Sequence, residues 1–208
     1  MKQRIPVLLL VLALACKGQQ SSTPTQTQAA TPPAPSTTGT PATTTESAVA
    51  PEVSPVGDIP DTQAFVKYRN AAGGYELDVP EGWARTENGP DVTFVNKIDG
   101  VKVTVAPASA APTAASVQAN EVRQIQAAGR AVTITNVSEV ALPGGKAVFI
   151  KYTSNSEPNA VTNKQVRLDN EAYVFYKNGK EATLTLWAPQ GADNVDQWQR
   201  MSKSFRWL

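Results

Sequence analysis

The sequence contains no histidine, and its single cysteine, Cys16, lies near the N-terminus. Without histidine, the chain lacks the imidazole that Ser-His-Asp triads, Cys-His pairs and most zinc sites need. Without a second cysteine it has no internal disulfide, so a hydrophobic core must stabilise the folded part. The formal net charge is +1, and Lys and Arg form no cluster of the kind that neutralises phosphates. We therefore expect no nucleic-acid partner, no cofactor, no metal site and no enzymatic activity.

The first fifteen residues have the pattern of a secretion signal. Two basic residues precede an apolar run from Ile5 to Ala15, which is too short to cross a hydrocarbon layer about 30 Å thick as a stable helix. Residues 13–16, Ala-Leu-Ala-Cys, resemble the lipobox of bacterial lipoproteins. The resemblance implies cleavage before Cys16 and a diacyl anchor on Cys16 that holds the chain on the extracytoplasmic side of a membrane. Lys17, the residue after the cysteine, favours the outer membrane as the location of the anchor. The alternative to lipidation is an ordinary signal-peptidase site beside a chance cysteine.

Residues 16–60 have the composition of a flexible linker. They consist mainly of Ser, Thr, Pro, Gln and Ala, with no Leu and no aromatic residue. Such a segment buries too little apolar surface to fold, and its prolines favour extended conformations. We predict a lipidated, disordered linker, with O-glycosylation as an alternative role for its Ser and Thr residues. The chain is thus divided into a signal peptide at 1–15, a linker at 16–60 and a globular domain at 61–208.

From residue 61 onward, short alternating apolar runs separated by Gly, Pro and Asn predict β-strands. The last two long runs flank Asn178-Gly179, which is the strongest short-range hairpin signal. The order of elements predicts an α+β domain with a largely antiparallel sheet and helices packed against it. The predicted strands are 65–69, 75–79, 91–95, 101–105, 131–141, 147–152, 165–176 and 181–188, and the predicted helices are 113–128 and one capped by Asp193.

Several stretches of this domain are similar to the PsbP-like family, which is named for the extrinsic PsbP protein of photosystem II. They are residues 74–83 (Gly-Tyr-Glu-Leu-Asp-Val-Pro-Glu-Gly-Trp), 89–94, the strand with Val103 and Val105, the hairpin at 173–188 and the Ser-Lys-Ser-Phe at 202–205. The resemblance implies an αβα sandwich around an antiparallel sheet. It also implies membership of a family that includes envelope lipoproteins and photosystem II accessory proteins. A role as a photosystem II accessory protein is the alternative if the host is photosynthetic.

Three residues of the 74–83 stretch are candidates for binding. Asp78 and Glu81 lie at the end of a predicted strand, where carboxylates can bind Ca²⁺ or act as paired acids. Alternation places Asp78 opposite the apolar face, however, which favours an ordinary solvent-facing role. Trp83 and the three other tryptophans can line a groove for a sugar or lipid, or pack in the core.

The longest polar connection of the domain, residues 154–163, is the other candidate. Loops carry function more often than the strands that they join, so a partner-facing loop is one interpretation. The other is a connection with no role of its own, because long loops are often merely tolerated. The candidate residues of this loop are Asn155, Glu157, Asn159 and Asn163.

The function predicted from the sequence is that of a membrane-anchored lipoprotein whose domain is a non-catalytic binding or assembly module for an envelope protein partner. The alternative is a carrier or sensor with a pocket for a lipid or glycan, and a hydrolase comes third. A deep apolar pocket would favour the carrier, whereas a closed core would favour the module.

Overall fold

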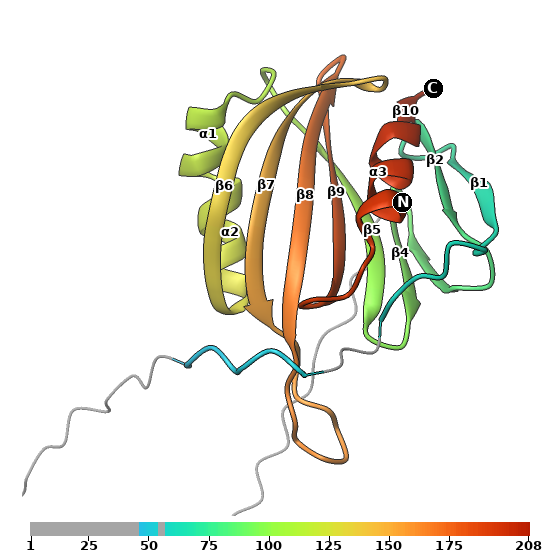
Figure 1. Ribbon diagram of the computed structural model, residues 1–208. Coiled ribbons are helices and arrows are strands. Elements are labelled where there is room, and N and C mark those ends of the chain that lie inside the picture. The colour runs from blue at the N-terminus through green and yellow to red at the C-terminus, as the bar shows by residue number, and fades with distance from the viewer. Residues whose placement is uncertain (1–45, 54–56) are drawn as a thin grey trace, which may run out of the picture. The chain divides into compact units, whose positions relative to one another are not determined.

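The computed structural model describes residues 46–53 and 57–208, which belong to one compact unit (Figure 1). The predicted signal peptide, Cys16 and most of the predicted linker lie outside the described residues. Within the part of the chain that is described, no helix is long and apolar enough to cross a membrane.

The described residues form ten strands and three helices. The strands are β1 (Phe65–Asn70), β2 (Tyr75–Pro80), β3 (Ala84–Asn88), β4 (Asp91–Asn96), β5 (Asp99–Pro107), β6 (Arg130–Leu142), β7 (Gly145–Asn155), β8 (Arg167–Lys177), β9 (Lys180–Pro189) and β10 (Arg206–Trp207). The helices are α1 (Ala114–Ala119), α2 (Glu121–Ala128) and α3 (Val195–Ser204).

Seven strands build the main sheet, in the order β3-β4-β5-β9-β8-β7-β6. Every neighbouring pair is antiparallel, as predicted. The predicted Asn-Gly turn joins β8 to β9, and both residues have positive φ, 51° at Asn178 and 79° at Gly179. Positive φ at both central positions is the requirement of a two-residue hairpin whose twist matches that of its strands.

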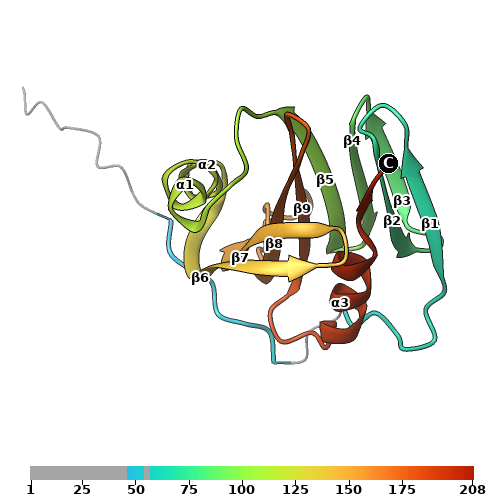
Figure 2. The ribbon, with the colours of Figure 1, turned by 90° about the horizontal axis from the view of Figure 1, so that it is seen from above.

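The main sheet separates two hydrophobic cores (Figure 2). On one face, α1 and α2 pack over β6, β7 and β8 through Val117 and Val122. On the other face lie α3 and a second sheet with the order β1-β2-β10. The predicted αβα arrangement is confirmed, whereas β3 and the short strand β10, which completes the second sheet, were not predicted.

The second sheet shows why its strands form where they do. Tyr75, Leu77 and Val79 alternate with polar residues in β2, and all three are buried as predicted. The ring of Phe205 is stacked between Tyr75 and Phe175, with centroid distances of 5.7 and 4.4 Å. Aromatic pairs of this kind each contribute about 0.5–1.5 kcal/mol beyond their buried area, so the end of α3 joins the two sheets.

Three sequence predictions were wrong in detail. The helix predicted at 113–128 is divided at Asn120, although Val117, Val122 and Ile125 still face the same core. The residue at the N-cap of α3 is Asn194 rather than Asp193. The loop predicted from residue 154 begins later, because Ser154 and Asn155 are buried residues of β7. Both residues form hydrogen bonds with buried polar side chains of β8, namely Asn170 and Arg167. A hydrophobic pattern in the sequence does not reveal such pairs.

The predicted linker reaches the domain before residue 61. Ile59 is buried in the larger core, and its amide donates to Asn194 Oδ1 over 2.6 Å. The side-chain nitrogen Nδ2 of the same Asn194 donates to the carbonyl of Gly57. The N-terminus of α3 therefore holds residues 57–59 against the domain.

Candidate functional site

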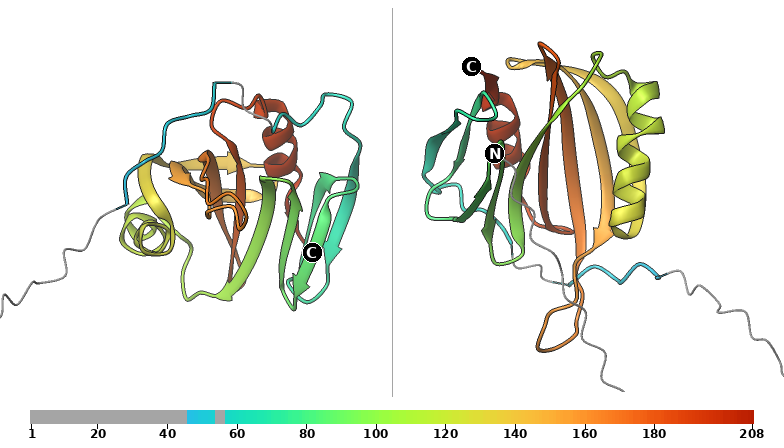
Figure 3. Two further views of the ribbon diagram at one scale, coloured as in Figure 1. Left: turned by 90° about the horizontal axis from the view of Figure 1, so that it is seen from below. Right: turned by 180° about the vertical axis from the view of Figure 1, so that it is seen from behind.

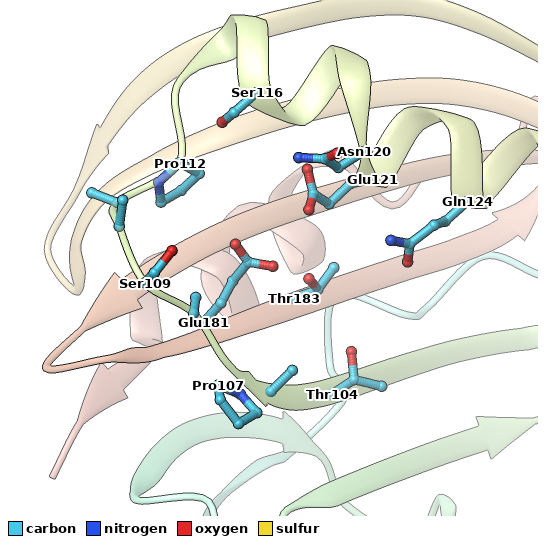
Figure 4. A pocket seen from close by; sticks show the side chains of 14 residues that line it. Thr104, Pro107, Ser109, Pro112, Ser116, Asn120, Glu121, Gln124, Glu181 and Thr183 are labelled. Carbon is cyan, nitrogen blue, oxygen red and sulfur yellow. The ribbon is translucent and has the colours of Figure 1, made fainter.

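The helices cover only part of the main sheet, and a groove lies beside them over β5 and β9 (Figure 4). Its volume is about 530 Å³. Strand residues such as Thr104 and Thr183 form the floor of the groove, and helix residues such as Asn120 and Gln124 form one wall. The connection between β5 and α1 closes one end. We call this cavity the helix–sheet groove.

The groove has two carboxylates that face each other from different elements, Glu121 of α2 and Glu181 of β9 (Figure 4). Partial burial raises the pKa of Glu181, and the negative charge of Glu121 raises it further. Hydroxyl and amide side chains of Ser116, Asn120 and Gln124 surround them. The groove therefore presents hydrogen-bond acceptors together with neutral donors, and it suits a polar ligand rather than a lipid chain.

Trp187 lies on the same face of β9 as Glu181 and Thr183, because alternate residues share a face. It is the one tryptophan of the four that is in neither hydrophobic core and packs against neither. It pairs across the strands with Gly100, and its ring covers the space in which a Cβ at position 100 would lie. A partly exposed indole thus lies farther along the polar face that floors the groove.

A second polar site lies at the ends of β6, β7 and β8, where residues 46–49 run across the domain (Figures 1 and 3). The carboxylate of Glu46 accepts hydrogen bonds from Arg130 Nη1 at 2.8 Å, Asn155 Nδ2 at 2.9 Å and Gln165 Nε2 at 2.7 Å. These hydrogen bonds lower the pKa of Glu46, the one from Asn155 most strongly. We call Arg130, Asn155, Gln165 and Arg167 the carboxylate cradle.

The cradle is anchored by Arg167, a buried guanidinium that is only 5% exposed. Its four hydrogen bonds reach neutral oxygens, including the carbonyl of Ala131 and Oδ1 of Asn155. Burial lowers the pKa of Arg167. The bond to Ala131 helps to hold that residue at a φ of 45°, a left-handed conformation that costs a residue with a Cβ about 1–2 kcal/mol. Strain of this kind persists only where the surrounding structure fixes it.

The residues predicted in the 154–163 loop are divided between the cradle and the loop tip. Asn155 belongs to the cradle, and the exposed Glu157 accepts a hydrogen bond from Arg130 at 2.9 Å. Asn159 and Asn163 instead shape the tip: Asn159 Oδ1 accepts from the amides of Val161 and Thr162, and Asn163 has a φ of 55°. The tip residues therefore stabilise a turn.

The other predicted residues, Asp78, Glu81 and Trp83, lie in or beside the second sheet. Asp78 is 3.8 Å from both Lys67 and Arg200 and forms ion pairs with them. Glu81 is exposed, and Trp83 packs against the larger core. The structure does not bring these residues into the groove or the cradle.

Sequence reasoning missed Arg130, Gln165 and Arg167 of the cradle, Glu46, which the cradle binds, and Glu121 and Glu181 of the groove. No local motif contains them, because they come from separate elements of the chain. Among residues 46–53 and 57–208, no group of three or more His, Cys, Asp or Glu side chains is placed to hold a metal ion.

Comparison with known proteins agrees with the fold. The chain is similar to the solution structure of cyanobacterial PsbP from Synechocystis, with a TM-score of 0.52, 18% identity, and coverage of 75% of this chain and 99% of that one. A weaker likeness is to LpqN of Mycobacterium tuberculosis, described as involved in cell envelope biogenesis, with a TM-score of 0.41, 12% identity, and coverage of 70% and 91%. A comparison with curated protein sequences gives no match. The sequence model of the PsbP family matches residues 63–207, which cover both sheets and all three helices, and the chain therefore belongs to the PsbP family.

Proposed function

We propose that this protein is a lipid-anchored envelope protein whose PsbP domain is a non-catalytic binding or assembly module, and that the helix–sheet groove holds its partner. The observation that supports the groove most directly is its composition. Hydroxyl, amide and carboxylate side chains of three separate parts of the fold converge on one open cavity. Such groups provide directional hydrogen bonds to a polar partner.

The anchor is proposed on the basis of the sequence. The apolar run that ends in Ala15-Cys16 and the composition of residues 17–45 suit a domain held at a membrane by an acylated cysteine. Metabolic labelling with a fatty acid, followed by detergent phase partition, tests this in the host. We expect Cys16→Ser to abolish labelling, and equal labelling of both chains would refute the anchor.

Photo-crosslinking from the groove tests the binding surface. A photoreactive amino acid at Gln124, an exposed residue of the groove wall, should give a discrete adduct in host membranes. The same amino acid at Arg69, exposed on β1 of the other sheet, is the matched control. Discrete adducts from position 69 but not from position 124 would move the binding surface to the second sheet.

A glycan is the second candidate ligand, and Trp187 is the specific observation that favours it. A flat indole beside hydroxyl side chains is a suitable surface for a sugar ring. Titration with oligosaccharides from the host envelope should then change the tryptophan fluorescence, and Trp187→Phe should reduce this change. A response that is the same in both chains would exclude Trp187 as the contact.

A further inference from the structure

The carboxylate cradle differs from the helix–sheet groove in that a peptide segment of the chain itself, residues 46–49, lies in the cradle. Residues 46–49 come from the linker, and the residues that hold them lie 84 to 119 positions later in the chain. The segment is bound through its main chain as well as its side chain. Asn155 Nδ2 donates to the carbonyl of Ser47, and Asn155 Oδ1 accepts from the amide of Val49 at 3.0 Å.

Asn155 is oriented for this contact by a residue of the domain itself. Its Oδ1 accepts a hydrogen bond from the buried Arg167 at 3.0 Å, which fixes the oxygen on that side and directs Nδ2 toward Glu46. Arg167 is in turn fixed by the carbonyl of Ala131 and the hydroxyl groups of β6 and β7. The amide group is therefore preorganised, and preorganisation lowers the entropy cost of binding.

The charges of the site are complementary to an anionic segment. The guanidinium of Arg130 lies between the carboxylates of Glu46 and Glu157, 2.8 and 2.9 Å away. Gln165 Nε2 donates both to Glu46 and to the carbonyl of Ser156, so a main-chain carbonyl of the domain helps to orient the nitrogen toward Glu46. One charged and two neutral donors thus meet a single carboxylate, which is the arrangement of a recognition site rather than of a chance surface ion pair.

We propose that the carboxylate cradle is a recognition site for an extended peptide segment that carries a carboxylate, and that residues 46–49 of this chain are its ligand in cis. Occupation of the cradle fixes the place at which the linker leaves the domain, at Glu46 rather than at Gly57, which Asn194 holds. A peptide with the same sequence competes for the cradle in trans. Because the cis segment has an effective concentration on the order of millimolar, the competing peptide binds measurably only when the cis segment is displaced.

The test uses the full chain in detergent and a fluorescent synthetic peptide of residues 43–53. Glu46→Lys in the chain places a positive charge against Arg130 and should empty the cradle without affecting either core. Glu52→Lys, which makes the same charge change at an exposed linker residue, is the matched control. We expect the peptide to bind the Glu46→Lys chain at least ten-fold more tightly than the wild-type or Glu52→Lys chain. Asn155→Asp added to Glu46→Lys should abolish binding.

Hydrogen exchange at the Val49 amide is the second readout. The amide should be protected in the wild-type and Glu52→Lys chains and lose protection in the Glu46→Lys chain. Equal protection in all three chains would overturn the proposal. Lost protection without peptide binding at millimolar concentration would also overturn it, because the contact would then depend only on the covalent connection.

Discussion

Gly100 on β5 and Trp187 on β9 are paired across the main sheet, and the indole ring takes the place of a side chain at position 100. A Cβ built on Gly100 would lie 1.8 Å from Cζ2 of Trp187, far inside van der Waals contact. An aromatic ring laid over a glycine on the neighbouring strand compensates for the missing side chain in a sheet. The pair therefore explains why a glycine is found in a strand that has hydrogen-bonded neighbours on both sides, and why the tryptophan lies outside both cores.

Gly100→Ala should destabilise the domain by about 2–3 kcal/mol, since the added methyl group has to displace the ring or the strand. Urea unfolding of the single and double variants checks the cause. Trp187→Ala removes the ring, so Gly100→Ala should cost much less in that background than in the wild type. Additive effects of the two substitutions would show that the ring is not what excludes the methyl group.

Many strands of both sheets were predictable from the sequence because their signals are local. Alternation identified β2 of the second sheet, and the Asn178-Gly179 pair identified the turn between β8 and β9 of the main sheet. The cradle was not predictable, because Glu46, Arg130 and Asn155 meet only after β6, β7 and β8 have paired. Asn155 was assigned to a loop since a polar residue at a strand end looks like loop sequence. Its burial depends on Arg167, twelve residues away.

Asp99 should make the stability of the domain depend on pH near neutrality. Its side chain is 4% exposed, and Oδ1 has no hydrogen-bond partner among the described residues. Burial raises the pKa of Asp99 from 3.8 to about 7; the charge of Lys97 lowers it, and that of Asp58 raises it. Because the folded state keeps a proton that the unfolded state releases, folding stability should fall as the pH rises from about 4 to 7.

The free energy of unfolding should fall by at most about 4 kcal/mol between pH 4 and 7, because each unit of pKa difference corresponds to about 1.36 kcal/mol. Asp99→Asn, which cannot ionise, should remove this dependence and raise the melting temperature at pH 8 relative to the wild type. The exposed Glu87→Gln is the control and should leave the pH dependence unchanged. A wild-type stability that rises over the same interval would contradict the raised pKa.

The connection between β7 and β8 should tolerate shortening only at its tip. Residues 159–163 are exposed and bond mainly to one another, so a short Gly-containing turn in their place should cost less than about 1 kcal/mol. Asn155→Ala should cost about 1–3 kcal/mol, because it leaves the buried Arg167 without one acceptor. Chemical denaturation of the two variants gives the comparison. A tip variant that is as unstable as Asn155→Ala would mean that the tip supports the fold.

Docking of residues 46–49 should weaken in acid, opposite to the trend expected from Asp99. The hydrogen bonds from Asn155, Gln165 and Arg130 lower the pKa of Glu46 below its ordinary value of 4.5. A carboxyl group with a lowered pKa in the docked state favours docking above its ordinary pKa, and this contribution is lost as the pH falls through the lowered one. The protection factor of the Val49 amide should therefore be constant from pH 5 to 7 and fall as the pH drops below the ordinary value of 4.5. Arg130→Gln removes one of the groups that lower this pKa, so it should move the fall in protection to higher pH. Protection that persists unchanged at pH 3 would show that the main-chain bonds to Asn155 hold the segment without the charge of Glu46.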